Sequence, residues 1–385
     1  MRGKSDPRHP MFYAIDIEAR IRPDHPVRPI KAVVDSILAE MSPLFDSAYA
    51  KVGRPSVPPE VLLRSLLLQC LYSVRSERQL VERIDTDLLF RWFCGLDPAE
   101  PVFDATAFTH NRPRLDENGI TGSFFDRVVK RAIEADLTSD EHFSVDGTLI
   151  ESYASIKSFK PLGGQDDGGD GDGGGFKPRN AEVNFHGQKR SNATHQSTTD
   201  SEAQLYRKGD GQPAKLAHMG HAMSENRHGL IMAVRVSEAN GTAECEAALA
   251  MVDELHERQR IKPRTLGADR GYDSGPWMIA VEERGISPHA AMHCGPIGGA
   301  KKTTARHKKN RPKMAARQRM ALRMREAGYS LSQRCRKKVE EGFGWCKTIA
   351  GLGRARHVGR WKITQQFELA AAAYNLVRMR KLLDG

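Results

Sequence analysis

Three acidic residues stand in sequence contexts that suit metal-dependent chemistry on phosphodiester bonds. Asp146 lies in the strand-like run 142–151, and Asp269 ends a second strand-like run, 264–269. Cleavage with two metal ions needs carboxylates that bridge hard cations roughly 3.5 to 4 Å apart. Acids at the ends of adjacent strands, with one more from a facing helix, would hold two Mg²⁺ ions, or Mn²⁺ in their place. We therefore expect Asp146 and Asp269 to be catalytic residues and metal ligands.

The third acid should come from a helix that follows the last strand, and Glu340 fits that position. Arg336, Glu340 and Lys347 recur near one face of a helix in the segment 334–347. The neighbouring face carries an apolar stripe that would let the helix lie on a sheet: Val339, Phe343 and Cys346. We expect Glu340 to complete the catalytic and metal-binding set, and Arg336 and Lys347 to bind DNA phosphates.

Each of these residues also has an ordinary structural interpretation. An Asp followed by Gly is usually a turn or cap residue. A Glu, Arg or Lys in a basic helix usually belongs to a solvated surface ion pair. The three acids together, in this order and beside a basic tract, are more specific than any one of them.

The charge of the chain is positive and unevenly distributed. The 59 Lys and Arg residues outnumber the 48 Asp and Glu residues, which gives a net charge of +11. The stretch 301–325 contains many basic residues and no acid before its end. A solvated surface usually mixes both signs, so this tract is expected to bind a polyanion, meaning the backbone of a nucleic acid. Its named candidates for DNA binding are Lys308, Lys309 and Arg311.

Composition narrows the class of protein. A chain of 385 residues can form two or three domains with a large core. No run approaches 18 apolar residues, and the first ten residues lack the apolar centre of a secretory signal. The 6 cysteines are scattered without a CxxC pair, which is typical of reduced thiols. We expect a cytoplasmic, nucleoid-associated protein with no membrane partner.

The predicted secondary structure changes near residue 135, from helices alone to alternating strands and helices. The first part predicts an all-α unit with helices at 28–40, 60–72, from Ser76, and at 87–93, 104–115 and 123–135. The second part predicts strands at 142–151, 215–223, 229–236, 264–269 and 286–292, with helices at 243–259, 274–284 and 363–383. This order is typical of an α/β, ribonuclease-H-like fold. A Gly- and Asp-rich stretch at about 160–200 predicts a flexible insertion.

The sequence resembles bacterial insertion-sequence transposases of the DDE class, in the IS5/IS4-like group. The similarity covers nearly the whole chain and is carried by strings such as SVDGT (144–148), MGHA (219–222), ADRGYD (268–273) and VEEGFGWCK (339–347). The resemblance implies a helical DNA-binding domain at 1–135 and a ribonuclease-H-like catalytic domain at 136–385. It further implies metal-dependent strand cleavage and transfer on double-stranded DNA, at the terminal inverted repeats and at the target, and a homodimer that brings two ends together.

The family's late motif assigns the third acid. It consists of Tyr, two residues, Arg, three residues, Glu, six residues and Lys, and here Arg336, Glu340 and Lys347 match it. The resemblance thus makes Asp146, Asp269 and Glu340 the three acids. Glu341 is adjacent, but only Glu340 keeps both spacings. Gln333 stands where the family has Tyr, and this departure leaves the role of that position open.

Two further hypotheses share these residues. The first is a catalytically silent DNA-binding or regulatory protein descended from a transposase. The second is another ribonuclease-H-like nuclease that acts on branched DNA or on RNA. Intact acids argue against the first hypothesis, and the long helical N-terminal part argues against the second.

Overall fold

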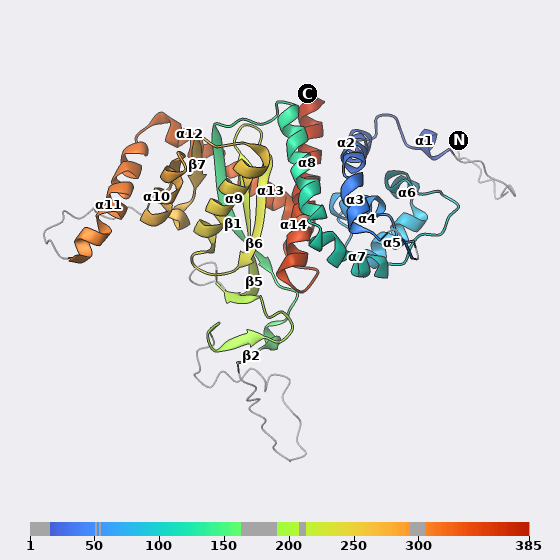
Figure 1. The fold of residues 1–385 in the computed structure, drawn as a ribbon, viewed down its shortest axis with the longest axis horizontal. Helices are drawn as coiled ribbons and strands as arrows, with labels where there is room; N and C mark the ends of the chain where they lie inside the picture. Colours follow the sequence, from blue (N-terminus) through green and yellow to red (C-terminus); the bar gives the residue numbers. More distant parts are fainter. Residues whose placement is uncertain are drawn as a thin grey trace, which may run out of the picture.

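The computed structural model describes residues 16–50, 52–53, 55–162, 191–207, 213–292 and 305–384. Figure 1 shows a central sheet with the N-terminal helices on one side and a smaller helical group, α10 to α12, on the other. The architecture is mixed α/β, with the helical part preceding the sheet along the chain.

The N-terminal part is helical, and its six predicted helices are confirmed. The helices are α1 (Ile17–Arg20), α2 (Val27–Glu40), α3 (Ser42–Ala48), α4 (Pro59–Leu71), α5 (Glu77–Thr86), α6 (Leu88–Cys94), α7 (Thr106–Glu117) and α8 (Ile120–Glu134). Helices α1 and α3 were not predicted. Ser76 caps α5 by accepting a hydrogen bond from the amide of Gln79 at 3.2 Å. Gly95, at φ 74°, ends α6.

The sheet has the strand order of a ribonuclease-H-like fold. Its main strands are β1 (His142–Glu151), β5 (Lys215–Glu225), β6 (Ile231–Glu238), β7 (Thr265–Ala268) and β8 (Ser287–Ala290). They lie in the order β6-β5-β1-β7-β8, with β5 antiparallel to β1 and β6, and with β7 parallel to β1 and β8. The short strand β4 (Gln204–Tyr206) pairs with the start of β5. All five predicted strands are therefore confirmed.

Helices cover both faces of the sheet. The remaining helices are α9 (Ala243–Gln259), α10 (Gly275–Glu283), α11 (Ala305–Arg323), α12 (Ala327–Cys335), α13 (Lys337–Thr348) and α14 (Arg360–Leu383). A methyl group at Gly147 of β1 would meet Glu244 of α9. A methyl group at Gly267 of β7, which pairs with Ser144, would instead meet Ser332 of α12. Because side chains alternate along a strand, α9 lies on one face and α12 on the other.

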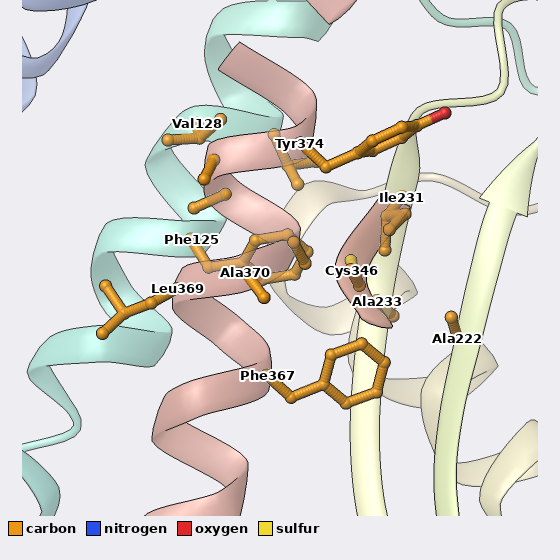
Figure 2. Packing of buried hydrophobic residues seen from close by; sticks show 14 of the residues in the cluster. Phe125, Val128, Ala222, Ile231, Ala233, Cys346, Phe367, Leu369, Ala370 and Tyr374 are labelled. Atoms are coloured by element: carbon orange, nitrogen blue, oxygen red, sulfur yellow. The ribbon is translucent and has the colours of Figure 1, made fainter. Parts of the chain in front are cut away.

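Helix α14 joins the N-terminal helices to the sheet. Figure 2 shows Phe125 and Val128 of α8 on one side of α14, and Ile231 and Ala233 of β6 on the other. Phe367, Ala370 and Tyr374 of α14 are buried between them. One hydrophobic core thus runs from the helical part into the sheet, across the boundary expected near residue 135.

Polar contacts fix α14 in register with the sheet. The Asn375 carboxamide accepts from the amide of Ile231 at 2.9 Å and donates to its carbonyl at 2.7 Å. On the other side, Gln365 donates to the carbonyl oxygen of Arg112 at 3.0 Å. Buried amides of this kind are costly unless paired, so they specify one alignment of the helix.

The expected insertion begins and ends in ordered structure. Strand β2 (Phe159–Pro161) pairs with β3 (His195–Ser197). Buried Asp200 accepts hydrogen bonds from Ser152 at 2.7 Å and bonds His218 of β5 at 2.9 Å. The Gly- and Asp-rich run itself lies outside the described residues.

Two details differ from what local sequence patterns suggest. Thr242 is the N-cap residue of α9, but its side chain makes no capping hydrogen bond, and the Asn240 side chain instead accepts from the amide of Ala243 at 2.8 Å. Asp146 was expected at a strand end, but β1 continues to Glu151 because β5 pairs with it along its whole length. Within the described residues, no helix is long and apolar enough to cross a membrane.

Candidate active site

Asp146 and Asp269 are placed beside each other by the register of two parallel strands. The pairing of β1 with β7 includes Ser144 opposite Gly267, and each aspartate lies two residues further along its chain. Asp269 is extended, with φ −81° and ψ −169°, so its chain continues the direction of β7. Residues two apart in extended chain lie on the same face. The two carboxylates therefore stand at the same level of the sheet, where pairing with β7 ends.

Local hydrogen bonds hold both carboxylates. The side chain of Asp269 accepts from the amide of Gly271 at 2.7 Å and starts the short 3₁₀ turn at Arg270–Tyr272. The side chain of Asp146 accepts from the amide of Gly147 at 2.9 Å. These carboxylates carry the oxygen donors that Mg²⁺ prefers, so the chemistry of the pair fits a divalent cation.

Helix α13 lies on β1 and β5 and presents Glu340 at its surface. Its predicted apolar stripe is buried: Val339, Phe343 and Cys346. The helix begins at Lys337, so Arg336 occupies the junction with α12 and not the helix interior. The Glu340 carboxylate is 53% exposed and forms an ion pair with Arg336 at 3.2 Å.

Glu341 faces a different neighbour. Its carboxylate pairs with Arg378 of α14 at 3.2 Å. Successive residues of an α-helix point about 100° apart, so Glu340 is turned away from α14 by that angle. The two acids of this helix therefore face different neighbours.

The described residues hold no group of three or more His, Cys, Asp or Glu side chains close enough to bind a metal. Strand register brings Asp146 and Asp269 to neighbouring positions. The carboxylate of Glu340 instead forms an ion pair with Arg336. In that ion pair the Glu340 side chain is 53% exposed, whereas the Arg336 side chain is only 20% exposed, so solvent reaches mainly the acidic partner.

Gln333, at the position where the resemblance predicts Tyr, ties α12 to the ends of two strands beside the site. Its carboxamide donates to the carbonyl oxygen of Ala268 at 3.3 Å and also to that of His289. These carbonyls belong to the ends of β7 and β8. Gln333 thus ties α12 to the strand residue that immediately precedes Asp269.

The basic tract is partly used inside the protein. Arg317 of α11 pairs with Asp273 at 2.7 Å, and Arg323 pairs with Glu282 of α10 at 2.7 Å. These contacts hold α11 against α10, next to the turn that carries Asp269. Arg311 is exposed in the same helix. Lys308 and Lys309 belong to α11, but their side chains lie outside the described part, as do residues 301–304.

Sequence reasoning missed one acid beside the pair. Glu244 lies in the first turn of α9, and its carboxylate covers both Gly147 and Gly271. The signal was present in the sequence, because each aspartate is followed within two residues by a glycine. A glycine is required where another group approaches the backbone closely.

The strand order defines a ribonuclease-H-like fold, in which Asp146 and Asp269 lie at neighbouring places on the adjacent parallel strands β1 and β7. The family model described as Transposase DDE domain matches residues 138–376, and the model described as Transposase domain (DUF772) matches residues 15–114. The chain belongs to the DDE transposase family. It is an enzyme that cleaves and transfers DNA strands, as the resemblance predicted.

Solved structures show only distant similarity. The piggyBac transposase synaptic complex with hairpin DNA is 10% identical, with a TM-score of 0.40, covering 94% of this chain and 76% of that one. The Mos1 strand transfer complex is 11% identical, with a TM-score of 0.21, covering 80% of this chain and 82% of that one. Among curated proteins, no sequence matches the chain.

Proposed function

We propose that this transposase acts at the terminal inverted repeats of an insertion sequence, with Asp146, Asp269 and Glu340 as its catalytic acids. The observation that supports the proposal is the register that sets Asp146 and Asp269 at one level of adjacent parallel strands. The three acids would hold two Mg²⁺ ions, or Mn²⁺ in their place. When bound, the ions would activate the attacking water or 3′-hydroxyl and stabilise the leaving oxygen.

The chain's own residues orient the reaction. The two aspartates are fixed by strand register and by hydrogen bonds to the amides of Gly147 and Gly271. Glu340 exchanges its bond with Arg336 for the site, and the freed guanidinium then binds a DNA phosphate through two parallel hydrogen bonds. Lys347, in the last turn of α13, adds a second phosphate contact.

The DNA backbone would follow α11 toward the site. Lys308, Lys309 and Arg311 supply the positive charge, and the pair between Arg317 and Asp273 links their helix to the Asp269 turn. Because both transposon ends must be cut and joined, we propose that two copies assemble as a homodimer on the paired ends. A protein with this substrate would work in the cytoplasm, associated with the nucleoid.

The test is cleavage of a labelled duplex that carries inverted-repeat ends from the DNA flanking the gene. We expect nicking at the ends with Mg²⁺ and none with EDTA. Asp146→Ala and Glu340→Ala should abolish it, whereas Glu341→Ala, which removes only the partner of Arg378, should retain it.

Three outcomes would contradict parts of this proposal. Cleavage that survives Glu340→Ala but not Glu341→Ala would make Glu341, and not Glu340, the third catalytic acid. End binding without cleavage by the wild-type protein would favour the silent DNA-binding protein. A preference for branched DNA over inverted-repeat ends would favour the nuclease.

A further inference from the structure

The carboxylate of Glu244 occupies the space that two glycines leave open beside the aspartate pair. A methyl group at Gly147 would lie 2.5 Å from Oε1 of Glu244. A methyl group at Gly271 would lie 2.9 Å from Oε2 of the same residue. Gly147 follows Asp146 directly, and Gly271 lies two residues after Asp269. One glutamate thus fills both gaps, and each gap adjoins one of the aspartates.

The same geometry puts Glu244 near Asp269. The methyl position at Gly271 that lies 2.9 Å from Oε2 of Glu244 lies 3.0 Å from Oδ1 of Asp269. The two carboxylates therefore flank a single point. Negative charges gathered this closely repel each other, and a divalent cation between them removes the repulsion.

A buried hydroxyl provides a second, independent observation. Tyr272 is fully buried, and its hydroxyl has no hydrogen-bond partner among the described residues. Burial, and after it the charges of Glu244, Asp146 and Asp269, raise the pKa of this phenol, so the ring lies within electrostatic reach of all three acids. An ordered water at the site would supply the partner that the buried hydroxyl lacks.

The position of Glu244 is not explained by helix capping. An acid in the first turn of a helix is favoured by the helix dipole, and Glu246 already supplies one in α9. Glu246 is exposed, whereas Glu244 is turned inward over the sheet. The inward acid, Glu244, shares with Asp269 the space beside Gly271.

We propose that Glu244 is a fourth carboxylate of the active site and binds a divalent cation together with Asp269. This inference builds on the proposed function and adds to it a ligand from α9, on the face of the sheet opposite α12. Glu244 and Glu340 then approach the aspartate pair from different sides.

The test is direct Mn²⁺ binding to the full chain, measured by the loss of the free-Mn²⁺ signal in electron paramagnetic resonance. We expect Glu244→Gln to weaken binding at least roughly tenfold, because replacing even the outer-shell partners of metal ligands weakens metal binding by about that factor. Glu246→Gln, in the same helical turn, should bind Mn²⁺ like the wild type. Glu244→Asp keeps the charge on a shorter side chain and should give an intermediate affinity, which serves if Glu244→Gln fails to fold.

Thermal unfolding with and without Mn²⁺ separates this role from a structural one. If Glu244 binds the metal, Glu244→Gln should unfold in EDTA at no lower temperature than the wild type, and Mn²⁺ should raise its unfolding temperature less. If Glu244 is purely structural, Glu244→Gln should unfold in EDTA at a lower temperature, and Mn²⁺ should raise its unfolding temperature as much as that of the wild type. Wild-type affinity in Glu244→Gln would overturn the proposal, as would a wild-type protein that binds no Mn²⁺. Mn²⁺ binding that needs Glu244, in a protein that cuts no inverted-repeat ends, would overturn the proposed function alone.

Discussion

The Gln333 carboxamide donates a hydrogen bond to the carbonyl oxygen of Ala268, the residue before Asp269, at 3.3 Å. The same carboxamide also bonds the carbonyl oxygen of His289 at the end of β8. One side chain therefore fixes the ends of two parallel strands to α12. The position of Asp269 depends on this contact as well as on the register with β1.

Replacing Gln333 with Ala should loosen the site. Both carbonyl oxygens lose one hydrogen bond, although that of Ala268 keeps the bond from the amide of Ala291 at 3.2 Å. A lost hydrogen bond of this kind costs about 0.5 to 1.5 kcal/mol. We expect the free energy of unfolding in urea to fall by that amount, and strand cleavage to slow because Asp269 loses its support. Gln318→Ala, an exposed glutamine on α11, is the control and should change neither quantity. Unchanged stability in Gln333→Ala would show that the bond is dispensable.

The elements of the fold could be predicted because local patterns specify them. Helix α9 was predicted at its observed bounds, and the alternating run 142–151 became β1. The family could be predicted from short strings around Asp146, Asp269 and Glu340, and the family match confirms it.

The detailed site could not be predicted, because it depends on contacts between distant residues. The neighbouring positions of Asp146 and Asp269, each two residues beyond the pair of Ser144 and Gly267, follow from strand register, which no single segment encodes. The place of Glu244 over Gly147 appears only when α9 is packed on β1. The ion pairs that Arg317 and Arg323 form with Asp273 and Glu282 could not be predicted either, because the stretch 301–325 itself contains only basic charges.

Adding a methyl group at Gly147 should disturb the site from the α9 side. Gly147→Ala would bring a carbon within 2.5 Å of the Glu244 carboxylate, so that carboxylate must move. We expect weaker Mn²⁺ binding and a stability loss of about 1 to 3 kcal/mol, the usual cost of overpacking. Adding Glu244→Ala to Gly147→Ala should restore the stability but not the Mn²⁺ binding.

Gly241→Ala is the matched control for this clash. Nothing lies within 4 Å of a methyl group at that position, just before α9. It should leave Mn²⁺ binding and stability unchanged. Full Mn²⁺ binding by Gly147→Ala would mean that the Glu244 carboxylate need not stay where it lies.

The basic residues of α11 should separate into two groups. Replacing Lys308, Lys309 and Arg311 with Ala should lower the dependence of DNA affinity on salt, because each lost phosphate contact reduces the logarithmic slope by about 0.9. Arg323→Ala should instead lower the unfolding temperature, since its partner is Glu282 of α10. Filter binding across a salt series and thermal unfolding measure the two effects. An unchanged salt slope in the triple variant would remove this helix from the DNA path.

The pH dependence of stability should report on Glu368 of α14. Burial raises the pKa of this carboxyl to about 7, against the opposing effect of the hydrogen bond from Thr121. A carboxyl whose pKa is higher in the folded state binds its proton more tightly there. Its stabilising effect is therefore complete below pH 4.5 and declines as the pH rises to about 7. Glu368→Gln keeps a neutral group of the same shape, so it should flatten this decline and stabilise the protein at pH 8 by up to about 3 kcal/mol. Urea unfolding from pH 5 to pH 8 measures the change, with Glu257→Gln on the exposed face of α9 as the control. If the free energy of unfolding of Glu368→Gln still falls as the pH rises, a group other than Glu368 causes the fall.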